Sequence, residues 1–241
     1  MNIAIILAGG TGSRMGADKP KQFIEVLGKP IIQYTLEAFQ RHPEVDVIEV
    51  VCIASHVEYM RELVNGAGVS KAKYICEGGP TFQESVMRGI ESLKGRASDD
   101  DVVLIHYGAS PFTSETVISD AIRVCREKGN ASPAAPMLYL TARRSDCEKT
   151  TEWLDRDLVM RLNTPQALRY GYAVDLYERA TRDGWLDRVD PHTVSLMLAM
   201  GEPVYFSLDE SANIKITTPS DLRLFEGWIL AGKQHAEGGA E

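Results

Sequence analysis

The residues best suited to chemistry lie near the amino terminus, in the segment Leu7-Ala8-Gly9-Gly10-Thr11-Gly12-Ser13-Arg14-Met15-Gly16. Glycines let backbone amides approach a polyanion without a Cβ in the way. Between Gly10 and Lys29 the chain has four basic residues and two acidic ones, although its overall formal charge is −8. This local excess of positive charge predicts a phosphate-rich ligand.

Two familiar glycine loops do not fit this segment. A Walker loop needs Lys directly after its last glycine, but Ala17 follows Gly16. The dinucleotide fingerprint would begin at Gly10 and Gly12 and then finds Met15 in place of its third glycine. A glycine-rich turn without any ligand remains the simpler alternative.

The elements that must position this loop alternate along the chain, because apolar runs of strand length are followed by segments of helical period, an order typical of a wound α/β sheet. The predicted strands are 2–7, 45–53, 72–76, 102–106, 131–140, 204–208 and 214–217. The predicted helices are 30–40, 58–64, 81–93, 117–125, 173–181, 194–200 and one that starts at Thr218-Pro219. The glycine loop follows the first strand, at the carboxyl edge where open α/β sheets bind ligands.

Residues 141–165 break this rhythm, since they are charged and lack a clear helix period. We expect an arm of about residues 139–168 that extends from the sheet. No internal repeat and no linker divides the chain, which predicts one domain over residues 1–241.

Composition excludes several classes of protein. An acidic chain is a poor nucleic-acid binder, because duplex binding depends on Lys and Arg that replace counterions. No apolar run approaches the roughly 20 residues that span a bilayer, and the run 3–8 is too short for a signal peptide. The four cysteines form no CxxC pair, so the sequence predicts reduced thiols in a cytoplasmic protein. The charge and the lack of a long apolar run predict that neither nucleic acid nor a membrane is a partner.

Several motifs in a fixed order resemble one enzyme family. The glycine segment, followed by Pro20-Lys21-Gln22-Phe23 and Gly28-Lys29-Pro30, is similar to the opening of cytidylyltransferases that activate methylerythritol phosphate or ribitol phosphate. The later motifs are Gly78-Gly79 with Ser85-Val86, Asp155-Arg156, Thr164-Pro165-Gln166 and Asn213-Ile214-Lys215-Ile216-Thr217-Thr218-Pro219. The first and last motifs look closer to the ribitol-phosphate branch. The run 14–19 alone would also suit a molybdenum-cofactor guanylyltransferase, which the later motifs disfavour.

This resemblance implies a three-layer α/β/α fold of the nucleotide-diphospho-sugar transferase type, with a mostly parallel twisted sheet and a protruding arm that forms a homodimer. It implies that a phosphorylated small molecule attacks the α-phosphorus of CTP and that pyrophosphate leaves, usually with Mg²⁺ on the phosphates. Charge develops on phosphorus and on the leaving group, so fixed cations should supply most of the acceleration.

The resemblance also implies roles for individual residues. By family position, Arg14 and Lys21 would stabilise the triphosphate and the transition state, and Lys215 would hold the α-phosphate. The other implied contacts are, for the nucleotide, Leu7, Ala8, Gly9, Gly10, Thr11, Gly12, Gly78, Gly79 and Ser85, and, for the acceptor, Tyr107, Ser110, Arg156 and Thr164. Arg156 lies on the arm, which in this family commonly reaches the other subunit.

One stretch departs from the family pattern. Where the family carries His-Asp-x-x-Arg-Pro, this chain has Tyr107 for the aspartate and Ser110 for the arginine. Further departures are Phe82 for an arginine, Tyr139-Leu140 for Asp-Thr, and Pro191-His192-Thr193 for a Thr-Asp-acid run. A phenol cannot replace a carboxylate as a Mg²⁺ ligand, so the metal ligands stay unknown.

Two hypotheses follow. In the first, the chain is an active CTP-dependent nucleotidyltransferase whose Mg²⁺ is held chiefly by the phosphates of CTP and whose acceptor pocket is reshaped. In the second, it is a catalytically impaired nucleotide-binding homologue that acts as a regulator or partner subunit. The retention of Arg14, Lys21 and Lys215 favours the first. His192 is expected only to start a helix, and residues 99–101 only to form a solvated turn at the opposite edge.

Overall fold

The computed structural model describes residues 1–10 and 19–238, of which the last six are described by their backbone only. Within them, one sheet of eight strands has the order β10-β7-β11-β6-β1-β4-β5, with β12 beside β7. Its strands are β1 (Asn2–Ala8), β4 (Val47–Cys52), β5 (Ala72–Glu77), β6 (Val102–Tyr107), β7 (Asn130–Pro136), β10 (Met160–Leu162), β11 (Gln166–Arg169) and β12 (Phe206–Leu208). The block β6-β1-β4-β5 is parallel, whereas β11 runs antiparallel to β6 and β7. The predicted α/β class is confirmed.

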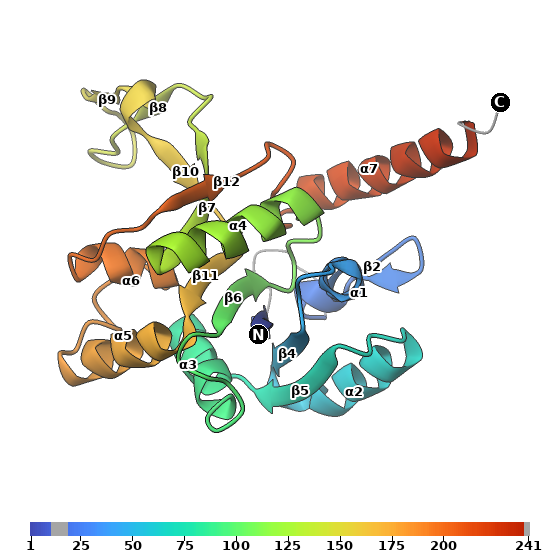
Figure 1. The fold of residues 1–241 in the computed structure, drawn as a ribbon. Coiled ribbons are helices and arrows are strands. Elements are labelled where there is room, and N and C mark those ends of the chain that lie inside the picture. The colour runs from blue at the N-terminus through green and yellow to red at the C-terminus, as the bar shows by residue number, and fades with distance from the viewer. Residues whose placement is uncertain (11–18, 239–241) are drawn as a thin grey trace.

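Helices cover both faces of this sheet (Figure 1). One face packs on α1 (Ile31–Arg41), α2 (Val57–Gly66) and α4 (Glu115–Lys128); the other packs on α3 (Phe82–Ser92), α5 (Tyr170–Arg182) and α6 (Thr193–Ala199). Successive side chains of a strand point to opposite faces, so Ile6 joins the first core and Ile5 the second. Every residue of β1 is buried, as expected for a central parallel strand.

The parallel strands bring their carboxyl ends to one edge. Ala8 lies opposite Cys52, Leu7 lies opposite Tyr107, and Cys52 lies opposite Glu77. The loops that follow β1, β5 and β6 therefore meet at this edge, as the sequence predicts for the glycine loop.

Two helix starts follow the predicted chemistry. Thr81 and Glu84 form a capping box, in which the Glu84 amide donates to Thr81 Oγ1 (3.1 Å) and the Thr81 amide donates to Glu84 Oε2 (2.9 Å). The last helix, α7 (Pro219–Gly238), begins with Pro219 at its first position. The Asp221 amide donates to Thr218 Oγ1 (3.3 Å), so Thr218 caps this helix.

The arm leaves the sheet after β7, which ends at Pro136 and not at Leu140 as predicted. It carries β8 (Thr141–Ala142), β9 (Trp153–Leu154) and the 3-10 helix η4 (Arg156–Leu158), and it projects from the body (Figure 1). The expected range 139–168 also holds β10 and the first three residues of β11, which pair within the main sheet, so the projecting part ends earlier.

The predicted strand 214–217 is wrong. The Ile216 amide donates to Ala109 O (2.8 Å), but the Ile214 amide turns back to Ala212 O (2.8 Å). This segment is therefore fastened to the loop after β6 without joining a strand.

The expected solvated turn at residues 99–101 is also different. Asp101 is buried and its carboxylate accepts from the amino-terminal ammonium group of Met1, while Asp100 pairs with Arg169 (3.1 Å). The turn lies at the opposite edge from the glycine loop, as predicted, but it ties the amino terminus and β11 together.

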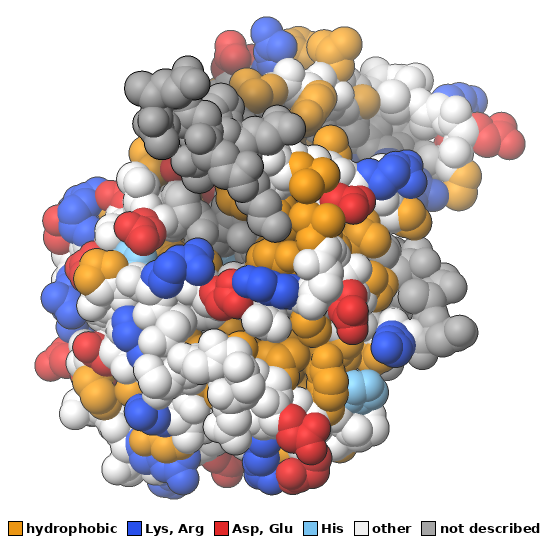
Figure 2. Space-filling model, turned by 90° about the vertical axis from the view of Figure 1, so that its right-hand side faces the viewer, with side chains coloured by type: hydrophobic (Ala, Val, Ile, Leu, Met, Phe, Trp, Pro, Cys, Tyr) orange, Lys and Arg blue, Asp and Glu red, His pale blue; other side chains and the backbone are white. Residues whose placement is uncertain are grey.

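Charges of both signs are mixed on the surface. Figure 2 shows Lys and Arg side chains beside Asp and Glu side chains on one face, next to a band of apolar side chains.

In the described part of the chain, no helix is both long and apolar enough to cross a membrane. All four cysteines are free thiols.

Candidate active site

Gln22 holds the start of the glycine loop through hydrogen bonds. Gly9 and Gly10 continue from Leu7 and Ala8 of β1, and Gln22 donates through Nε2 to Ala8 O (2.8 Å) and Gly10 O (2.9 Å). Gln22 belongs to the 3-10 helix η2 (Lys21–Phe23), so this contact seats Lys21 beside the loop. Thr11, Gly12 and Arg14 lie outside the described residues, and their roles stay predictions.

Ser85 lies against two glycine loops. Its hydroxyl accepts from the Gly79 amide (3.1 Å) and donates to Thr81 O (2.9 Å). A Cβ on Gly9 or Gly78 would lie 3.1 or 3.0 Å from Ser85 Oγ, and one on Gly79 would lie 2.3 Å from Glu84 Cβ. Glycine at these positions therefore lets the two loops pack closely against Ser85 and Glu84 of α3. The hydroxyl thus shapes the loop, and its predicted contact with cytosine stays a prediction.

Two predicted catalytic cations meet on one short segment. Lys21 donates through Nζ to Ile216 O (2.9 Å), and Ile216 is fully buried. The neighbouring Lys215 places its Nζ 3.6 Å from the centroid of the Tyr107 ring. Residues from opposite ends of the chain therefore bring two positive charges to the carboxyl edge of β6.

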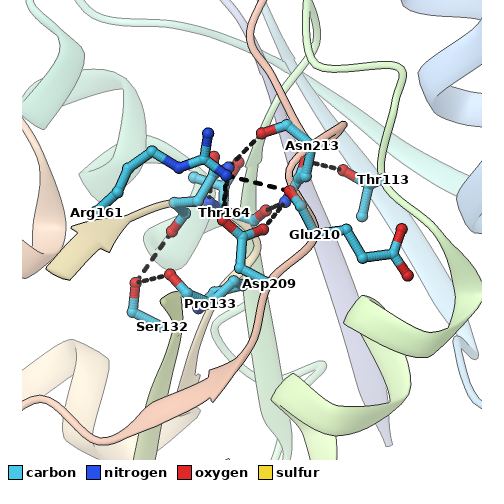
Figure 3. Close-up of polar contacts among 9 residues, drawn as sticks. Thr113, Ser132, Pro133, Arg161, Thr164, Asp209, Glu210 and Asn213 are labelled. Carbon is cyan, nitrogen blue, oxygen red and sulfur yellow. Dashed lines mark hydrogen bonds and ion pairs between the residues drawn. The ribbon is translucent and has the colours of Figure 1, made fainter. Parts of the chain in front are cut away.

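A buried polar network fastens the segment that carries Lys215 (Figure 3). The Asp209 side chain is fully buried and accepts from Arg161 Nη2 (2.9 Å) and Asn213 Nδ2 (2.7 Å). Asn213 also donates to Thr164 O (3.0 Å) and accepts from Thr113 Oγ1 (3.0 Å). A buried charge needs such partners to offset its lost hydration.

Sequence reasoning missed Asp209 and Arg161. They lie 48 residues apart in the chain, and neither belongs to a recognisable motif. Asn213 belongs to a motif, but nothing near it in the sequence indicates that its side chain bonds both Asp209 and Thr164.

Three side chains that depart from the family pattern lie in contact. The Tyr107 hydroxyl is 2.6 Å from His192 Nδ1, and the Phe82 ring lies 5.6 Å from the Tyr107 ring and 5.4 Å from the His192 ring. His192 precedes α6 as expected, but it also takes part in this cluster. Burial raises the pKa of Tyr107 and lowers the pKa of His192, so at neutral pH a phenol donates to a neutral imidazole.

The other predicted acceptor residues divide into two groups. Ser110 and Thr164 are each 1 % exposed, and within the described residues neither hydroxyl has a hydrogen-bond partner. A buried hydroxyl without a partner costs free energy, and a polar ligand or water at the site would remove that cost. Arg156 instead lies exposed on η4 in the arm, away from this group.

The site's chemistry and the order of its motifs can be compared with known proteins. The sequence profile of the family described as "IspD: 2-C-methyl-D-erythritol 4-phosphate cytidylyltransferase" matches residues 2–230. The chain belongs to this family. The resemblance inferred from the motifs is thereby confirmed.

Curated relatives of this IspD-family chain fall into two groups. The ribitol-5-phosphate cytidylyltransferase of Lacticaseibacillus paracasei is 38% identical over 235 residues, which cover 95% of this chain and 98% of that protein. The 2-C-methyl-D-erythritol 4-phosphate cytidylyltransferase of Geobacter metallireducens is 37% identical over 227 residues, which cover 94% of this chain and 96% of that protein. Overall identity alone does not separate the two acceptors.

Solved structures share the fold. The 2-C-methyl-D-erythritol 4-phosphate cytidylyltransferase of Thermus thermophilus has a TM-score of 0.73 at 27% identity, and the match covers 93% of this chain and 97% of that chain. The 4-diphosphocytidyl-2C-methyl-D-erythritol synthase of Anaerococcus prevotii has a TM-score of 0.77 at 24% identity over 95% of this chain and 98% of that chain. The second likeness concerns the fold alone.

The described residues do not form a protein-held metal site. Among them, no group of three or more His, Cys, Asp or Glu side chains is placed to hold a metal ion. The position that the resemblance assigns to a metal-binding aspartate is Tyr107, whose neutral hydroxyl contacts His192. This side chain is a poor ligand for a hard cation such as Mg²⁺.

Proposed function

We propose that this IspD-family protein transfers CMP from CTP to a phosphorylated acyclic polyol and releases pyrophosphate. Ribitol 5-phosphate and 2-C-methyl-D-erythritol 4-phosphate are the acceptors to test, because both activities occur among its relatives. The observation that carries the proposal is that Lys21, next to the glycine loop, donates to the backbone of Ile216, the residue that follows Lys215 in the chain. Two fixed cations at that place suit the charge that develops on a reacting phosphate.

The proposed reaction forms one bond and breaks one. An oxygen of the acceptor phosphate attacks the α-phosphorus of CTP, and the bond from that phosphorus to the β-phosphate oxygen breaks in line with the attack. The acceptor phosphate is already anionic, so the step needs no proton-abstracting base. Lys21 and Lys215 would stabilise the charge on phosphorus and on the departing pyrophosphate.

A divalent cation enters the proposal through the substrate. Phosphate oxygens are good Mg²⁺ ligands, so we propose that the triphosphate of CTP carries the ion. Removal of divalent cations by EDTA should then abolish turnover and weaken CTP binding only in part.

The test is pyrophosphate release from CTP and Mg²⁺ with each polyol phosphate in turn, with UTP and ATP as nucleotide controls. Release with one acceptor and CTP is the expected result. CTP binding without release across both acceptors and a wider panel of sugar and amino-alcohol phosphates would favour the catalytically impaired homologue instead.

We also propose that the arm pairs two copies of the chain. It exposes large apolar side chains that a lone chain would leave in water, namely Leu138, Tyr139, Leu140, Trp153 and Leu158. Sedimentation should give a dimer for the native protein and a monomer for the variant Leu140→Asp with Trp153→Ser. A native monomer would contradict this part of the proposal.

The cytoplasm stays the predicted location. The four cysteines, Cys52, Cys76, Cys125 and Cys147, are unpaired thiols, which suits a reducing compartment. Cell fractionation with an antibody against the protein would test it.

A further inference from the structure

The ammonium end of Lys215 contacts an aromatic ring. Its segment joins no strand, and its Nζ lies 3.6 Å from the centroid of the Tyr107 ring. A cation within about 6 Å of an aromatic ring centroid is attracted by the ring's electrons. The ring of Tyr107 therefore contributes directly to where this ammonium group sits.

The Tyr107 ring is itself fixed at its far end. Its hydroxyl reaches His192 Nδ1 at 2.6 Å, and Phe82 packs against both rings at 5.6 and 5.4 Å. These three side chains come from the end of β6, the residue before α6 and the start of α3. The position of the Tyr107 ring therefore depends on contacts from two other parts of the chain, the start of α3 and the residue before α6.

A second buried contact holds the two flanking helices together. The Tyr177 hydroxyl donates to Gln83 Oε1 (2.8 Å) and is 2.9 Å from Thr193 Oγ1. Gln83 follows Phe82 in the chain, and Thr193 follows His192. This buried link fixes the spacing of α3 and α6, and with it the spacing of the Phe82 and His192 rings.

We infer that Phe82, Tyr107 and His192 form a ring platform that positions Lys215 toward the α-phosphate of CTP. Tyr107 carries the ammonium group on its ring, and His192 holds that ring through the phenol hydroxyl. All three act as positioning residues, because they work through Lys215. The inference rests on the proposed function for the role of Lys215, but the platform itself can be tested without turnover.

Protonation of His192 should loosen the platform. The groups that face this imidazole are the Tyr107 hydroxyl, Lys215, and Asp190, whose Oδ2 lies 3.8 Å from Nε2. A protonated imidazole donates at Nδ1 instead of accepting, so the Tyr107 hydroxyl must turn, and the added positive charge repels Lys215. Burial keeps the pKa of His192 below its usual value, so the platform stays intact at neutral pH and loosens in acid.

The first experiment compares kcat across single variants. Lys215→Met should lower kcat about 100-fold, a loss of the size seen when one charge-stabilising donor is removed. His192→Leu should lower kcat about 10-fold with little change in the KM for CTP. His192→Asn keeps an acceptor near the place of Nδ1, so it should retain most of the rate at neutral pH. It should lack the fall of kcat in acid that we expect of the native enzyme.

Variants of Tyr107 distinguish the contribution of its ring from that of its hydroxyl. Tyr107→Phe keeps the ring and loses the hydroxyl, so its kcat should lie between those of the native enzyme and Tyr107→Leu. The matched control is Tyr74→Leu, which removes a similar cation and ring contact, that of Arg96 at 4.3 Å, on β5. This control should leave kcat unchanged.

A double variant decides whether His192 acts through Lys215. If it does, adding His192→Leu to Lys215→Met causes no further loss of kcat. If the two losses multiply, His192 contacts a substrate directly and the inference is overturned.

Nuclear magnetic resonance tests the platform in the absence of turnover. An ammonium group this close to a ring face places the Lys215 ε-methylene protons in the shielding region, so their signal should be shifted upfield. The shift should persist in Tyr107→Phe and disappear in Tyr107→Leu, with Lys215→Met as the assignment control. An unshifted signal in the native protein would overturn the inference, whereas a shifted signal with no turnover on any acceptor would leave the platform standing and contradict the proposed function.

Discussion

The two halves of the site are built in different ways. On the side predicted to bind the nucleotide, Gly9, Gly78 and Gly79 leave room for side chains of α3, and the Ser85 hydroxyl accepts from the Gly79 amide. On the side predicted to bind the acceptor, rings and buried polar side chains from segments far apart in the chain contact one another, with Tyr107 in the ring cluster and Asn213 in the polar network. The first half depends on the absence of side chains, and the second depends on their identity.

This difference indicates which half can change. A loop that leaves little room for a Cβ at Gly9, Gly78 and Gly79 tolerates few substitutions there, so we expect these positions to stay close to the family pattern. A pocket of side chains can be rebuilt as a group, and Phe82, Tyr107 and His192 are three departures from that pattern that lie in mutual contact. We therefore expect an ordinary nucleotide site next to an altered acceptor site.

The largest effect is expected where the two halves meet. Lys21→Ala should lower turnover about 100-fold and weaken CTP binding far less, because its strongest interaction arises as charge develops on phosphorus. Lys71→Ala is the matched control, since Lys71 Nζ also donates to a backbone carbonyl, that of His42 (2.6 Å). Steady-state kinetics with calorimetry of CTP binding would check this, and equal losses would make Lys21 a binding residue only.

The next largest effect is expected from a substitution on the side predicted to bind the nucleotide. Gly79→Ala places a Cβ 2.3 Å from Glu84 Cβ, so the loop must shift. We expect the Kd for CTP to rise about 10-fold or more, with the KM for the acceptor nearly unchanged. Gly66→Ala, where a Cβ meets nothing within 4 Å, serves as the control. Loss of acceptor affinity in Gly79→Ala would break the division between the two halves.

A smaller effect should follow from a change confined to the acceptor side. Thr164→Val removes a buried hydroxyl that has no partner among the described residues, so stability should stay the same or rise by about 1 kcal/mol. The KM for the acceptor should rise about 10-fold while CTP binding is retained. Thr113→Val, which removes the hydroxyl that donates to Asn213, should instead lower the melting temperature. An unchanged acceptor KM in Thr164→Val would remove Thr164 from the site.

The smallest effect on catalysis is expected at Glu49, which lies on β4 below both halves. Burial raises the pKa of this carboxyl to about 8 from its ordinary value of 4.5, and its Oε2 has no partner within the described residues. The folded state thus holds a proton that the unfolded chain loses above about pH 4.5, so stability falls as pH rises from there to about pH 8.

Glu49→Gln should remove this dependence. At about pH 8 the variant should be more stable by roughly 2–4 kcal/mol, at about pH 4 it should match the native protein, and kcat should not change. Thermal unfolding across this range would measure the difference. A stability gain that is equal at both ends of the pH range would contradict the raised pKa.

The sequence predicts most elements of the fold because their signals are local. The capping box at Thr81 and Glu84 and the start of α7 at Thr218-Pro219 lie within a few residues of the helices that they begin. The segment 214–217 was predicted as a strand because its composition suits one, yet composition does not show whether a neighbouring strand is present. Its amide groups bond elsewhere, so no strand forms.

The candidate site was predictable only in part, for the same reason. Lys21 and Lys215 belong to motifs, but the contact of Lys21 with Ile216, the neighbour of Lys215, joins residues 195 positions apart in the chain. Tyr107 and His192 lie 85 residues apart in the chain, and no pattern of spacing in the sequence predicts their contact. His192 was therefore expected only to start a helix.

The most direct test of the central claim is phosphorus NMR of the protein with CTP, Mg²⁺ and each polyol phosphate. We predict that the CTP signals decline while pyrophosphate and a new diphosphodiester appear in equal amounts, with one of the two acceptors and not in its absence. Unchanged CTP signals with both acceptors, in a sample that binds CTP, would contradict it.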